Sequence, residues 1–466
     1  MCGIIGIYGN PEAATLVYLG LYAQQHRGQE GAGIVSYNGQ QVYRHMGQGL
    51  VADVYSDPGT LRELPGSMAI GHTRYSTTGG MDAKNVGPLL FNIEDTPVSI
   101  AHNGNLVNLT AMRRQLQKEG AIFQTTTDTE IIVHLMARAS GDRMADRLAA
   151  ALEQVEGAYS LLILTPEGLI AARDPYGWRP FVLGRLGETW VAASETCALD
   201  LIGAEELRDV KPGEVLLIND DGLQTVHNLP RQKPKHCIFE YIYFSRPDSR
   251  IYGANVDKLR RKLGKTLAEE APVPTADIVI SVPDSSNTAT LGYASRSGIK
   301  HEIGLIRNHY VGRSFIRPEQ DLRDLTVKLK FNTVKGVLAG REVVIVDDSI
   351  VRGTTMRNLV RLLRQAGPKK VHVRISSSPI RHHCQFGLDF PTEEELIANQ
   401  RTKEQIEAYL GVDSLMYLSL EGMLSSMDQP PDHFCTACFS GEYPITLLED
   451  SGKNVFEQPK PKSGDH

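Results

Sequence analysis

The feature that most restricts the fold is a repeated order of strand, polar loop and helix in the second half of the chain. Residues 277–282 (DIVISV) and 343–346 (VVIV) are short apolar runs, each followed by a polar loop and a helix-like segment. Further strands are expected at residues 302–306 and 371–375. Continuous apolar strands joined by helices predict a parallel sheet that is covered on both faces.

The first half of the chain has a different pattern, with many short strands and few helices. Its apolar runs are bounded by Gly, Asn, Asp and Pro, which is typical of strands. Apolar residues at helical spacing predict two helices among them. Strands are expected at residues 4–8, 98–101, 159–164 and 215–218, and helices at 110–119 and 129–140.

A basic, proline-bearing stretch at 229–235 (LPRQKPK) separates the two patterns and predicts a domain boundary. The chain of 466 residues is then expected to contain two large domains and two shorter segments. These are an α+β domain over 2–230, a linker and bridging segment over 231–254, an α/β domain with a C-terminal extension over 255–445, and a loosely held polar tail over 446–466.

Charge and hydropathy exclude several classes of protein. The formal net charge is −6, so no basic excess indicates binding to nucleic acid or to an anionic membrane surface. No apolar run reaches the roughly 20 residues of a membrane span. The N-terminus lacks the basic and apolar regions of a secretory signal. Six cysteines in such a chain indicate reduced thiols and a cytoplasmic location.

Cys2 is a candidate nucleophile because of its position. Once Met1 is removed, one residue carries both a thiol and an α-amine, with ordinary pKa values of about 8.5 and about 7.7–8.0. The amine can accept the thiol proton near neutral pH, so no histidine is needed as a base. The alternative is that Cys2 is only an early strand residue, and its position alone favours that alternative.

Polar residues elsewhere in the first domain could serve such a nucleophile. Arg74 could bind a carboxylate through its planar guanidinium. Asn103 and Gly104 follow a predicted strand, and their N–H groups could stabilise an oxyanion. Asp128 precedes a predicted helix, so it is either a helix N-cap or a group that binds a substrate ammonium.

Five motifs occur in the order MCGIIG, QHRGQEGAG, GHTRYSTTG, HNGN and TDTE. In this order they resemble the glutaminase domain of class II glutamine amidotransferases, which are N-terminal-nucleophile hydrolases. The resemblance implies a four-layer αββα sandwich in which Cys2 attacks the carboxamide of glutamine. It also implies that Arg74 and Asp128 bind the α-carboxylate and α-ammonium of glutamine, and that Asn103 and Gly104 form the oxyanion hole.

The string VVIVDDSIVRGTT predicts a second site at the C-terminal edge of the parallel sheet. There Asp347 and Asp348 suit hydroxyl groups and a divalent cation such as Mg²⁺. The loop after them runs into a helix N-terminus, which suits a phosphate. The ligand would therefore be a phosphorylated sugar. The alternative is an ordinary turn with two solvated acids, which the whole string makes less favoured.

This string resembles the signature of type I phosphoribosyltransferases, which use 5-phosphoribosyl-1-pyrophosphate (PRPP). The resemblance implies that Asp347 and Asp348 meet the ribose hydroxyls and that Ser285, in SVPDSSN, contacts Mg²⁺. Residues 317–332 resemble a flexible loop over PRPP, although a solvated surface helix is an equal reading of that stretch. The implied 5′-phosphate loop consists of Ser349, Ile350, Val351, Arg352, Gly353, Thr354 and Thr355.

Four cysteines form a third candidate site. Cys435 and Cys438 form a CxxC pair, and Cys237 and Cys384 each stand beside a histidine. The residue types alone leave a redox pair, zinc and an iron–sulfur cluster open, with zinc slightly favoured and no metal at all also possible. Cys197 lacks such a pattern and is expected to be a small buried residue.

The segments HCIFEYIYFSRPDS and CTACFSGEYP resemble the cluster-bearing branch of the glutamine PRPP amidotransferases. The resemblance implies that the four cysteines hold a 4Fe–4S cluster, which joins the domains remote from the chemistry. Some relatives carry a propeptide before the cysteine, whereas here only Met1 precedes it. The form that keeps Met1 is expected to be inactive as a glutaminase.

The resemblance implies a glycosyltransferase reaction in which glutamine, PRPP and water give 5-phosphoribosylamine, glutamate and pyrophosphate. It also implies the first committed step of purine synthesis, transfer of ammonia between two sites, feedback inhibition by purine nucleotides and a homotetramer. The rival interpretations are an aminosugar synthase, an asparagine synthetase and a non-catalytic PRPP sensor. The chain has no SGGxDS loop of the kind that the synthetase needs.

Overall fold

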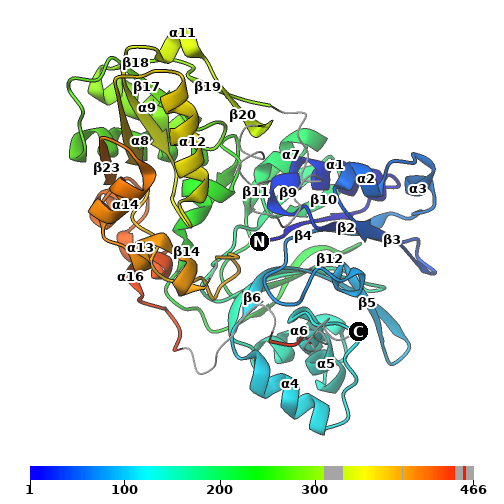
Figure 1. Ribbon diagram of the computed structural model, residues 1–466. Helices are drawn as coiled ribbons and strands as arrows, with labels where there is room; N and C mark the ends of the chain where they lie inside the picture. The colour runs from blue at the N-terminus through cyan, green and yellow to red at the C-terminus, as the bar shows by residue number, and fades with distance from the viewer. Residues whose placement is uncertain (309–328, 391, 447–454, 458–466) are drawn as a thin grey trace, which may run out of the picture.

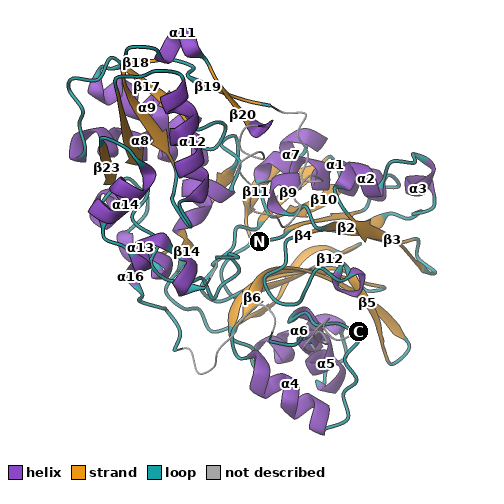
Figure 2. Cartoon of the chain, viewed as in Figure 1, coloured by secondary structure: helices purple, strands orange, loops and turns teal. Residues whose placement is uncertain are grey.

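The computed structural model describes residues 1–308, 329–390, 392–446 and 455–457. These residues form two domains, one from blue to green and one from green to orange in Figure 1. Strands and helices are distributed through both (Figure 2). Within these ranges no helix has both the length and the apolar character needed to cross a bilayer.

The first domain contains two antiparallel sheets. The seven-stranded sheet has the order β11 (Glu205–Asp209), β9 (Val182–Leu186), β10 (Thr189–Ala193), β1 (Gly3–Tyr8), β4 (Met68–Arg74), β2 (Gly31–Tyr37) and β3 (Val42–Gln48). The six-stranded sheet has the order β13 (Gly222–Asn228), β12 (Glu214–Asn219), β8 (Gly168–Arg173), β7 (Gly157–Thr165), β6 (Thr96–Leu106) and β5 (Leu89–Ile93).

Apolar side chains from both sheets pack face to face, among them Ile4 and Ile70 against Leu162 and Leu216. The outer face of the first sheet is covered by α1 (Ala13–Ala23) and α7 (Thr196–Ile202). The outer face of the second is covered by α4 (Leu109–Lys118), α5 (Thr129–Arg138) and α6 (Met144–Leu152). These four layers confirm the expected αββα sandwich.

The second domain is built on a five-stranded parallel sheet. Its order is β18 (Lys300–His301), β17 (Ile278–Ser281), β21 (Glu342–Asp347), β22 (Lys370–Ile375) and β23 (Ser414–Tyr417). One face packs against α8 (Val256–Glu270) and α9 (Asn287–Ser297), and the other against α12 (Thr354–Gln365) and α14 (Lys403–Leu410). The strands are buried on both faces, which explains their continuous apolar runs.

One expected strand is divided in two. Residues 302–306 were expected to form a single strand, but Lys300 and His301 alone pair with β17 as β18. The chain then leaves the sheet, and β19 (Leu305–Arg307) pairs with β20 (Phe331–Thr333) as an antiparallel ribbon. The apolar pattern indicated an extended backbone there. It could not specify which strand these residues pair with, because strand pairing depends on tertiary packing. Most of the expected PRPP loop, residues 317–328, lies outside the described residues.

The segment between the domains has regular structure. Cys237 ends β14 (His236–Cys237), which pairs in parallel with β24 (Phe434–Cys435). A π-helix, η3 (Glu240–Phe244), follows and leads toward α8. In the tail, the side chain of Glu457 accepts hydrogen bonds from the Gly80 amide at 2.5 Å and the Thr126 hydroxyl at 2.7 Å. At this residue the tail is therefore bound to the first domain.

Two candidate active sites and a group of four cysteines

Cys2 lies directly before β1 and is 7% exposed. Its thiol sulfur is 3.4 Å from the Tyr75 amide nitrogen and 3.5 Å from the Tyr75 carbonyl oxygen. Met1 is fully buried, and burial is the main reason that the pKa of its amine falls to about 5. While Met1 is attached, the nitrogen of Cys2 is an amide and cannot act as a base.

The side chain of Asn103 is oriented by Cys2 itself. The Cys2 amide donates to Asn103 Oδ1 at 3.2 Å. This leaves Asn103 Nδ2 buried and without a hydrogen-bond partner among the described residues. Gly104 follows, and a Cβ atom there would lie 1.9 Å from the Ala158 carbonyl oxygen, so only glycine fits. An unpaired donor beside a nucleophile is the arrangement that an oxyanion hole requires.

Arg74 ends β4 and is 5% exposed. Its guanidinium donates to the carbonyls of Gly79 and Gly80, both at 3.2 Å, while Nε is buried with no partner among the described residues. Glu30, from the motif QHRGQEGAG, holds the same loop by accepting from the Ser76 amide at 2.8 Å and hydroxyl at 3.0 Å. Arg74 is thus held in place, and its Nε–H remains available to bind a ligand.

Asp128 occupies the N-cap position of α5, but its side chain makes no capping hydrogen bond. It accepts instead from the Leu106 amide at 3.0 Å, and His102 Nδ1 lies 3.6 Å away. Burial opposes its charge, but the attraction of His102 and the hydrogen bonds outweigh burial and lower the pKa of Asp128, with Arg74 contributing. The buried Asp128 carboxylate is therefore anionic, as an ammonium site requires.

In the second domain, Asp347 ends β21 and Asp348 is 5% exposed. Burial, and then repulsion by Asp348, raise the pKa of Asp347 well above its ordinary value, and burial also raises the pKa of Asp348. Ser286 donates to Asp347 at 2.7 Å and to Asp348 at 3.3 Å, and Ser285 also bonds Asp348. Two crowded carboxyl groups with nearby hydroxyls fit a divalent cation.

The loop after the acids leads into α12. Gly353 is the N-cap residue at φ 74°, and a Cβ atom there would lie 2.6 Å from Ile397 Cδ1. With no side chain at the cap, the first N–H groups of α12 remain available for a phosphate. Arg352 takes no part in that cradle here, because its guanidinium bonds Glu395 at 3.2 Å.

The structure brings the four cysteines of the third candidate site together. Cys237 pairs in register with Cys435 in the parallel bridge between β14 and β24, and Cys438 lies on α16 (Ala437–Ser440). Burial, and then the other thiols of the group including Cys384, raise the pKa of Cys438. Burial raises the pKa of Cys237 to about 11 and that of Cys435 to about 12, although the nearby Arg179 guanidinium acts to lower both pKa values.

Cys237 and Cys438 are buried, and Cys384 and Cys435 are half-buried. Thiols that repel one another when ionised suit a metal cluster, since a coordinating thiol is deprotonated by its metal. The described residues nevertheless include no compact set of three or more potential ligands arranged for a metal ion. The loop after Cys384 contacts the first domain, because Asn105 Nδ2 donates to the Gln385 carbonyl at 2.9 Å. That a cluster here is remote from the chemistry stays a prediction, although this loop adjoins Gly104 through Gly387.

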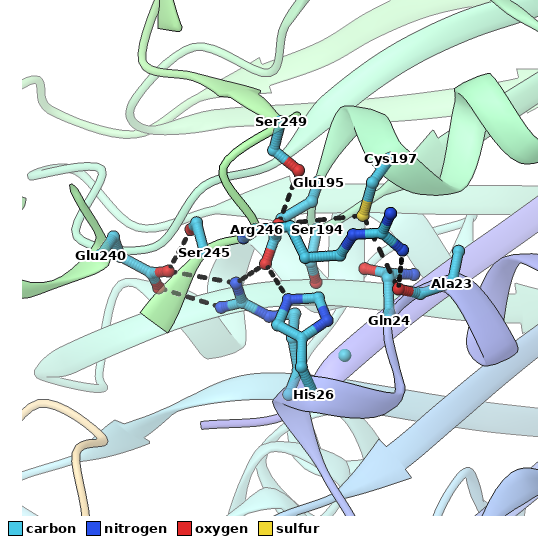
Figure 3. A network of polar contacts seen from close by, with 12 residues as sticks. Ala23, Gln24, His26, Ser194, Glu195, Cys197, Glu240, Ser245, Arg246 and Ser249 are labelled. Atoms are coloured by element: carbon cyan, nitrogen blue, oxygen red, sulfur yellow. Dashed lines mark hydrogen bonds and ion pairs between the residues drawn. The ribbon is translucent and has the colours of Figure 1, made fainter. Parts of the chain in front are cut away.

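Several buried residues that support both sites escaped the sequence interpretation. Arg27, within QHRGQEGAG, donates to the Cys2 carbonyl at 3.0 Å, although the sequence analysis gave this side chain no role. Its acidic partners Glu195 and Glu240 carry no local signal, because they become neighbours only on folding (Figure 3). Ser286 bonds both acids of the second site, whereas the sequence analysis named its neighbour Ser285 as the Mg²⁺ contact. Arg260 lies on the apolar face of α8, where a buried arginine was not expected.

Two family models match the chain. The one for a glutamine amidotransferase domain matches residues 72–201, and the one for a phosphoribosyl transferase domain matches residues 263–379. Among curated relatives, the amidophosphoribosyltransferase of Bacillus subtilis (strain 168) is 48% identical over 455 residues, which are 97% of this chain and 95% of the relative. The amidophosphoribosyltransferase of Methanothermobacter thermautotrophicus is 45% identical over 454 residues, 96% of this chain and 95% of the relative.

Solved structures agree with these matches. One, described as the allosteric regulatory enzyme of purine biosynthesis, has a TM-score of 0.92 and 48% identity, covering 96% of this chain and 97% of its own. Another is the glutamine PRPP amidotransferase of B. subtilis complexed with ADP and GMP, with a TM-score of 0.91 and 48% identity, covering 96% and 98% of the two chains.

Proposed function

The chain belongs to the amidophosphoribosyltransferase family of purine biosynthesis, and on that premise we propose how its residues divide the reaction between two sites. The enzyme converts glutamine, PRPP and water to 5-phosphoribosylamine, glutamate and pyrophosphate. The full-length relatives make the aminosugar synthase, asparagine synthetase and sensor interpretations wrong.

The first domain is the glutaminase. After removal of Met1, the amine of Cys2 accepts the thiol proton, and the sulfur attacks the carboxamide carbon of glutamine. Asn103 Nδ2 and the Gly104 amide stabilise the oxyanion, and the ammonium of Cys2 returns its proton to the leaving ammonia. Water then hydrolyses the thioester to glutamate. The observation that carries this assignment is the buried, unpaired Nδ2 of Asn103, held in place by Cys2 itself.

The substrate is oriented by two fixed charges. Arg74 binds the α-carboxylate of glutamine through donors that its loop contacts leave free, and Asp128 binds the α-ammonium. Arg74 also contributes to the lowered pKa of Asp128, so the two charges influence each other in the folded protein.

The second domain transfers the phosphoribosyl group. Asp347 and Asp348 bind the ribose hydroxyls, and the 5′-phosphate rests on residues 349–355 at the N-terminus of α12. Mg²⁺ held by Asp347, Asp348 and Ser285 would balance the charge of the departing pyrophosphate. The raised pKa values of both acids support a cation there, because a positive charge relieves their repulsion. Positioning and electrostatics then suffice for attack by ammonia at C1 of the ribose.

We further propose that Cys237, Cys384, Cys435 and Cys438 hold a 4Fe–4S cluster. The burial of Cys237 and Cys438, the mutual repulsion of the thiolates and the adjacent cationic Arg179 support a bound metal cluster rather than four free thiols. Bound there, the cluster would join the bridging segment, which contains Cys237, to the second domain, which contains the other three cysteines. Iron and inorganic sulfide analysis of anaerobically purified protein tests this proposal, and zinc without sulfide would contradict it.

Three further features follow from the family as proposals. Ammonia would pass between the sites without entering bulk water, so an external ammonia trap should not suppress glutamine-dependent synthesis. A purine nucleotide would compete with PRPP for the 5′-phosphate loop; the B. subtilis relative was solved with ADP and GMP. We expect a cytoplasmic homotetramer, and sedimentation would give the oligomeric state.

The decisive experiment for the proposed function is a glutaminase assay on protein whose N-terminus has been verified by mass spectrometry. Glutamate release is expected to depend on PRPP and Mg²⁺, and ammonia should replace glutamine in phosphoribosylamine synthesis. Protein that lacks Met1 but releases no glutamate under any of these conditions would contradict the assignment of Cys2.

A further inference from the structure

The two charged residues proposed to bind the head group of glutamine come from separate segments of the first domain. Arg74 ends β4, and the turn after it includes Gly79 and Gly80, whose carbonyls accept from its guanidinium at 3.2 Å. Asp128 follows directly after the threonines at 125–127 and precedes α5. Whether one substrate can contact both charges therefore depends on how these two segments are held together.

The two segments are in direct contact. The Thr126 amide donates to Asn85 Oδ1 at 3.0 Å, and Asn85 Nδ2 donates to Thr126 Oγ1 at 2.8 Å and to the Gly80 carbonyl at 3.0 Å. A Cβ atom on Gly79 would lie 2.8 Å from the Thr126 carbonyl oxygen, so the turn lies against the threonines without space between them. The segments therefore meet at Gly80 and Thr126.

The tail residue Glu457 bonds both sides of this junction. Its Oε1 accepts from the Gly80 amide at 2.5 Å and from the Thr126 hydroxyl at 2.7 Å. Since the Thr126 hydroxyl also accepts from Asn85, the hydrogen bonds form a chain that ends at the carboxylate. The bonds from Thr126 and then Gly80 lower the pKa of Glu457, so the carboxylate is ionised and a strong acceptor.

The neighbouring tail residue Phe456 attaches the same segment to α4. Its ring packs against the apolar core under α4, α5 and α6, and the Arg113 guanidinium of α4 lies 4.6 Å from the ring centroid. That guanidinium also lies 3.9 Å from the centroid of Phe123 and donates to the Thr125 carbonyl at 2.8 Å. Figure 1 shows residues 455–457 in red beside the helices of the first domain. An apolar contact and a charged contact therefore hold adjacent residues of the tail.

We propose that Phe456 and Glu457 form a tie between the two segments that bind the glutamine head group. Glu457 is a positioning residue, because it acts through these segments on the distance between Arg74 and Asp128 and not on the substrate itself. The inference deepens the proposed function and rests on it, since it concerns how the glutaminase binds glutamine. Loss of the tie should weaken binding of the head group and leave the chemical step intact.

Two truncated chains test the tie. A chain that stops after residue 454 lacks Phe456 and Glu457, whereas a chain that stops after residue 457 keeps both and is the matched control. The shorter chain should have a KM for glutamine raised by about five- to tenfold, the size expected for one or two lost hydrogen bonds. Its kcat should stay within about twofold, because the head group is bound alike before and during the reaction. The control should behave as the full chain does.

A substrate analogue separates positioning from a general loosening of the domain. Glutaramate, which is glutamine without its α-amino group, can bind Arg74 but has no ammonium for Asp128. Its kcat/KM should therefore be the same in the two truncated chains, measured as ammonia release, while kcat/KM for glutamine falls in the shorter one. The selectivity for glutamine over glutaramate should thus fall by about five- to tenfold.

A conservative substitution tests the carboxylate alone in the full chain. Glu457→Gln keeps an oxygen that can accept from Gly80 and Thr126, so the KM for glutamine should stay within about twofold of wild type. Glu457→Ala removes that oxygen and should raise the KM. Ammonia-dependent phosphoribosylamine synthesis should be unchanged in both variants, because it does not use the glutamine site.

Three results would decide against the tie. An unchanged KM for glutamine in the shorter chain would overturn it directly. Equal losses of kcat/KM for glutamine and glutaramate would show that the tail supports the domain and not the spacing. If the shorter chain fails to fold, as shown by its melting temperature and lost ammonia-dependent synthesis, the two Glu457 substitutions decide, and equal KM values in them would overturn the proposal. Failure of the proposed function is distinct, because the full chain itself would then release no glutamate.

Discussion

At the scale of single residues, the glutaminase site is marked by donors that the protein buries and does not use itself. Asn103 Nδ2 and Arg74 Nε are both buried without a partner among the described residues. A buried unpaired donor costs free energy unless a ligand satisfies it. These two atoms therefore indicate where the developing oxyanion and the carboxylate of glutamine would lie.

Replacing Asn103 tests this reading. Asn103→Ala should lower kcat for glutamine hydrolysis by about 10²–10³-fold and leave the KM for glutamine nearly unchanged, because an oxyanion donor acts mainly in the transition state. Ammonia-dependent synthesis should be unaffected. Glutamate and pyrophosphate release measure the two activities, and Asn108→Ala, in an exposed loop, is the control. A rise in KM alone would assign Asn103 to substrate binding instead.

The acid pair of the second site predicts a gain of stability when one charge is removed. Burial and repulsion raise the pKa of Asp347 above its unfolded value, so the folded protein binds more protons and loses stability as pH rises through the folded pKa. At pH 8 without Mg²⁺ or PRPP, Asp347→Asn should raise the melting temperature by about 2–4 °C. With both present, the variant should not synthesise phosphoribosylamine. The gain should shrink toward pH 4. A lower melting temperature at pH 8 would contradict the prediction.

At the scale of elements, the N-terminus of α12 combines a glycine in the left-handed conformation with a free helix end. Gly353 has φ 74°, and the space for a Cβ atom is taken by Ile397. A side chain would therefore disturb the loop that precedes the helix. The proposed phosphate site would therefore depend on this glycine as well as on the helix dipole.

Gly353→Ala should cost about 1–2 kcal/mol of folding stability, because a residue with a Cβ atom is strained in this conformation. It should also raise the KM for PRPP by about tenfold or more, since loop and helix end shift together. Glutaminase measured without PRPP should be unchanged. Gly367→Ala, at a helix end with φ 81° and open space around it, is the control for the backbone strain alone. Equal effects of both substitutions on KM would contradict a phosphate role for the loop.

The tail residue Glu457 is expected to support the glutamine site from outside. It binds Gly80, whose carbonyl also receives the guanidinium of Arg74. Glu457→Ala should raise the KM for glutamine by less than about fivefold, because its contacts are only partly buried and such polar contacts contribute little. The KM for PRPP should not change. A lower KM for glutamine would show that the tail obstructs the site.

At the scale of the whole molecule, the two domains meet around buried charges and the four cysteines. Arg179 of the first domain contacts Met1 and the Phe386 carbonyl, near Cys237 and Cys384. The same region contains the loop that bonds Asn105. A group bound by the thiols would therefore affect the contact between the loop after Cys384 and β6.

Cys435→Ser should abolish iron and sulfide binding and lower the melting temperature by about 5 °C or more, because ligand binding to a folded site is also folding free energy. Cys197→Ala is the matched control, since Cys197 is buried but bonds Glu195 and Ala23 outside the group. Iron content and thermal unfolding give the result. Full iron and sulfide in Cys435→Ser would remove Cys435 from the proposed ligands.

Much of the architecture could be predicted because it is encoded locally. Some patterns involve only residues that are close to one another in the sequence. Examples are the apolar runs of β17, β21 and β22 and the apolar stripe of α12. Residues 302–306 were predicted less well, since their partner strands are chosen by packing. The four cysteines could be listed from sequence, but the contact between the Cys384 loop and β6 could not.

The sequence by itself determined the two domain types, the order of their motifs and the candidate side chains, because periodicity and motif spacing are properties of neighbouring residues. Only the tertiary structure decided what surrounds those side chains. The unpaired amide of Asn103 and the ion pair of Arg27 with Glu240 exist because distant segments pack together and exclude water. Burial then sets which charges and donors remain for the substrates, and no local pattern carries that information.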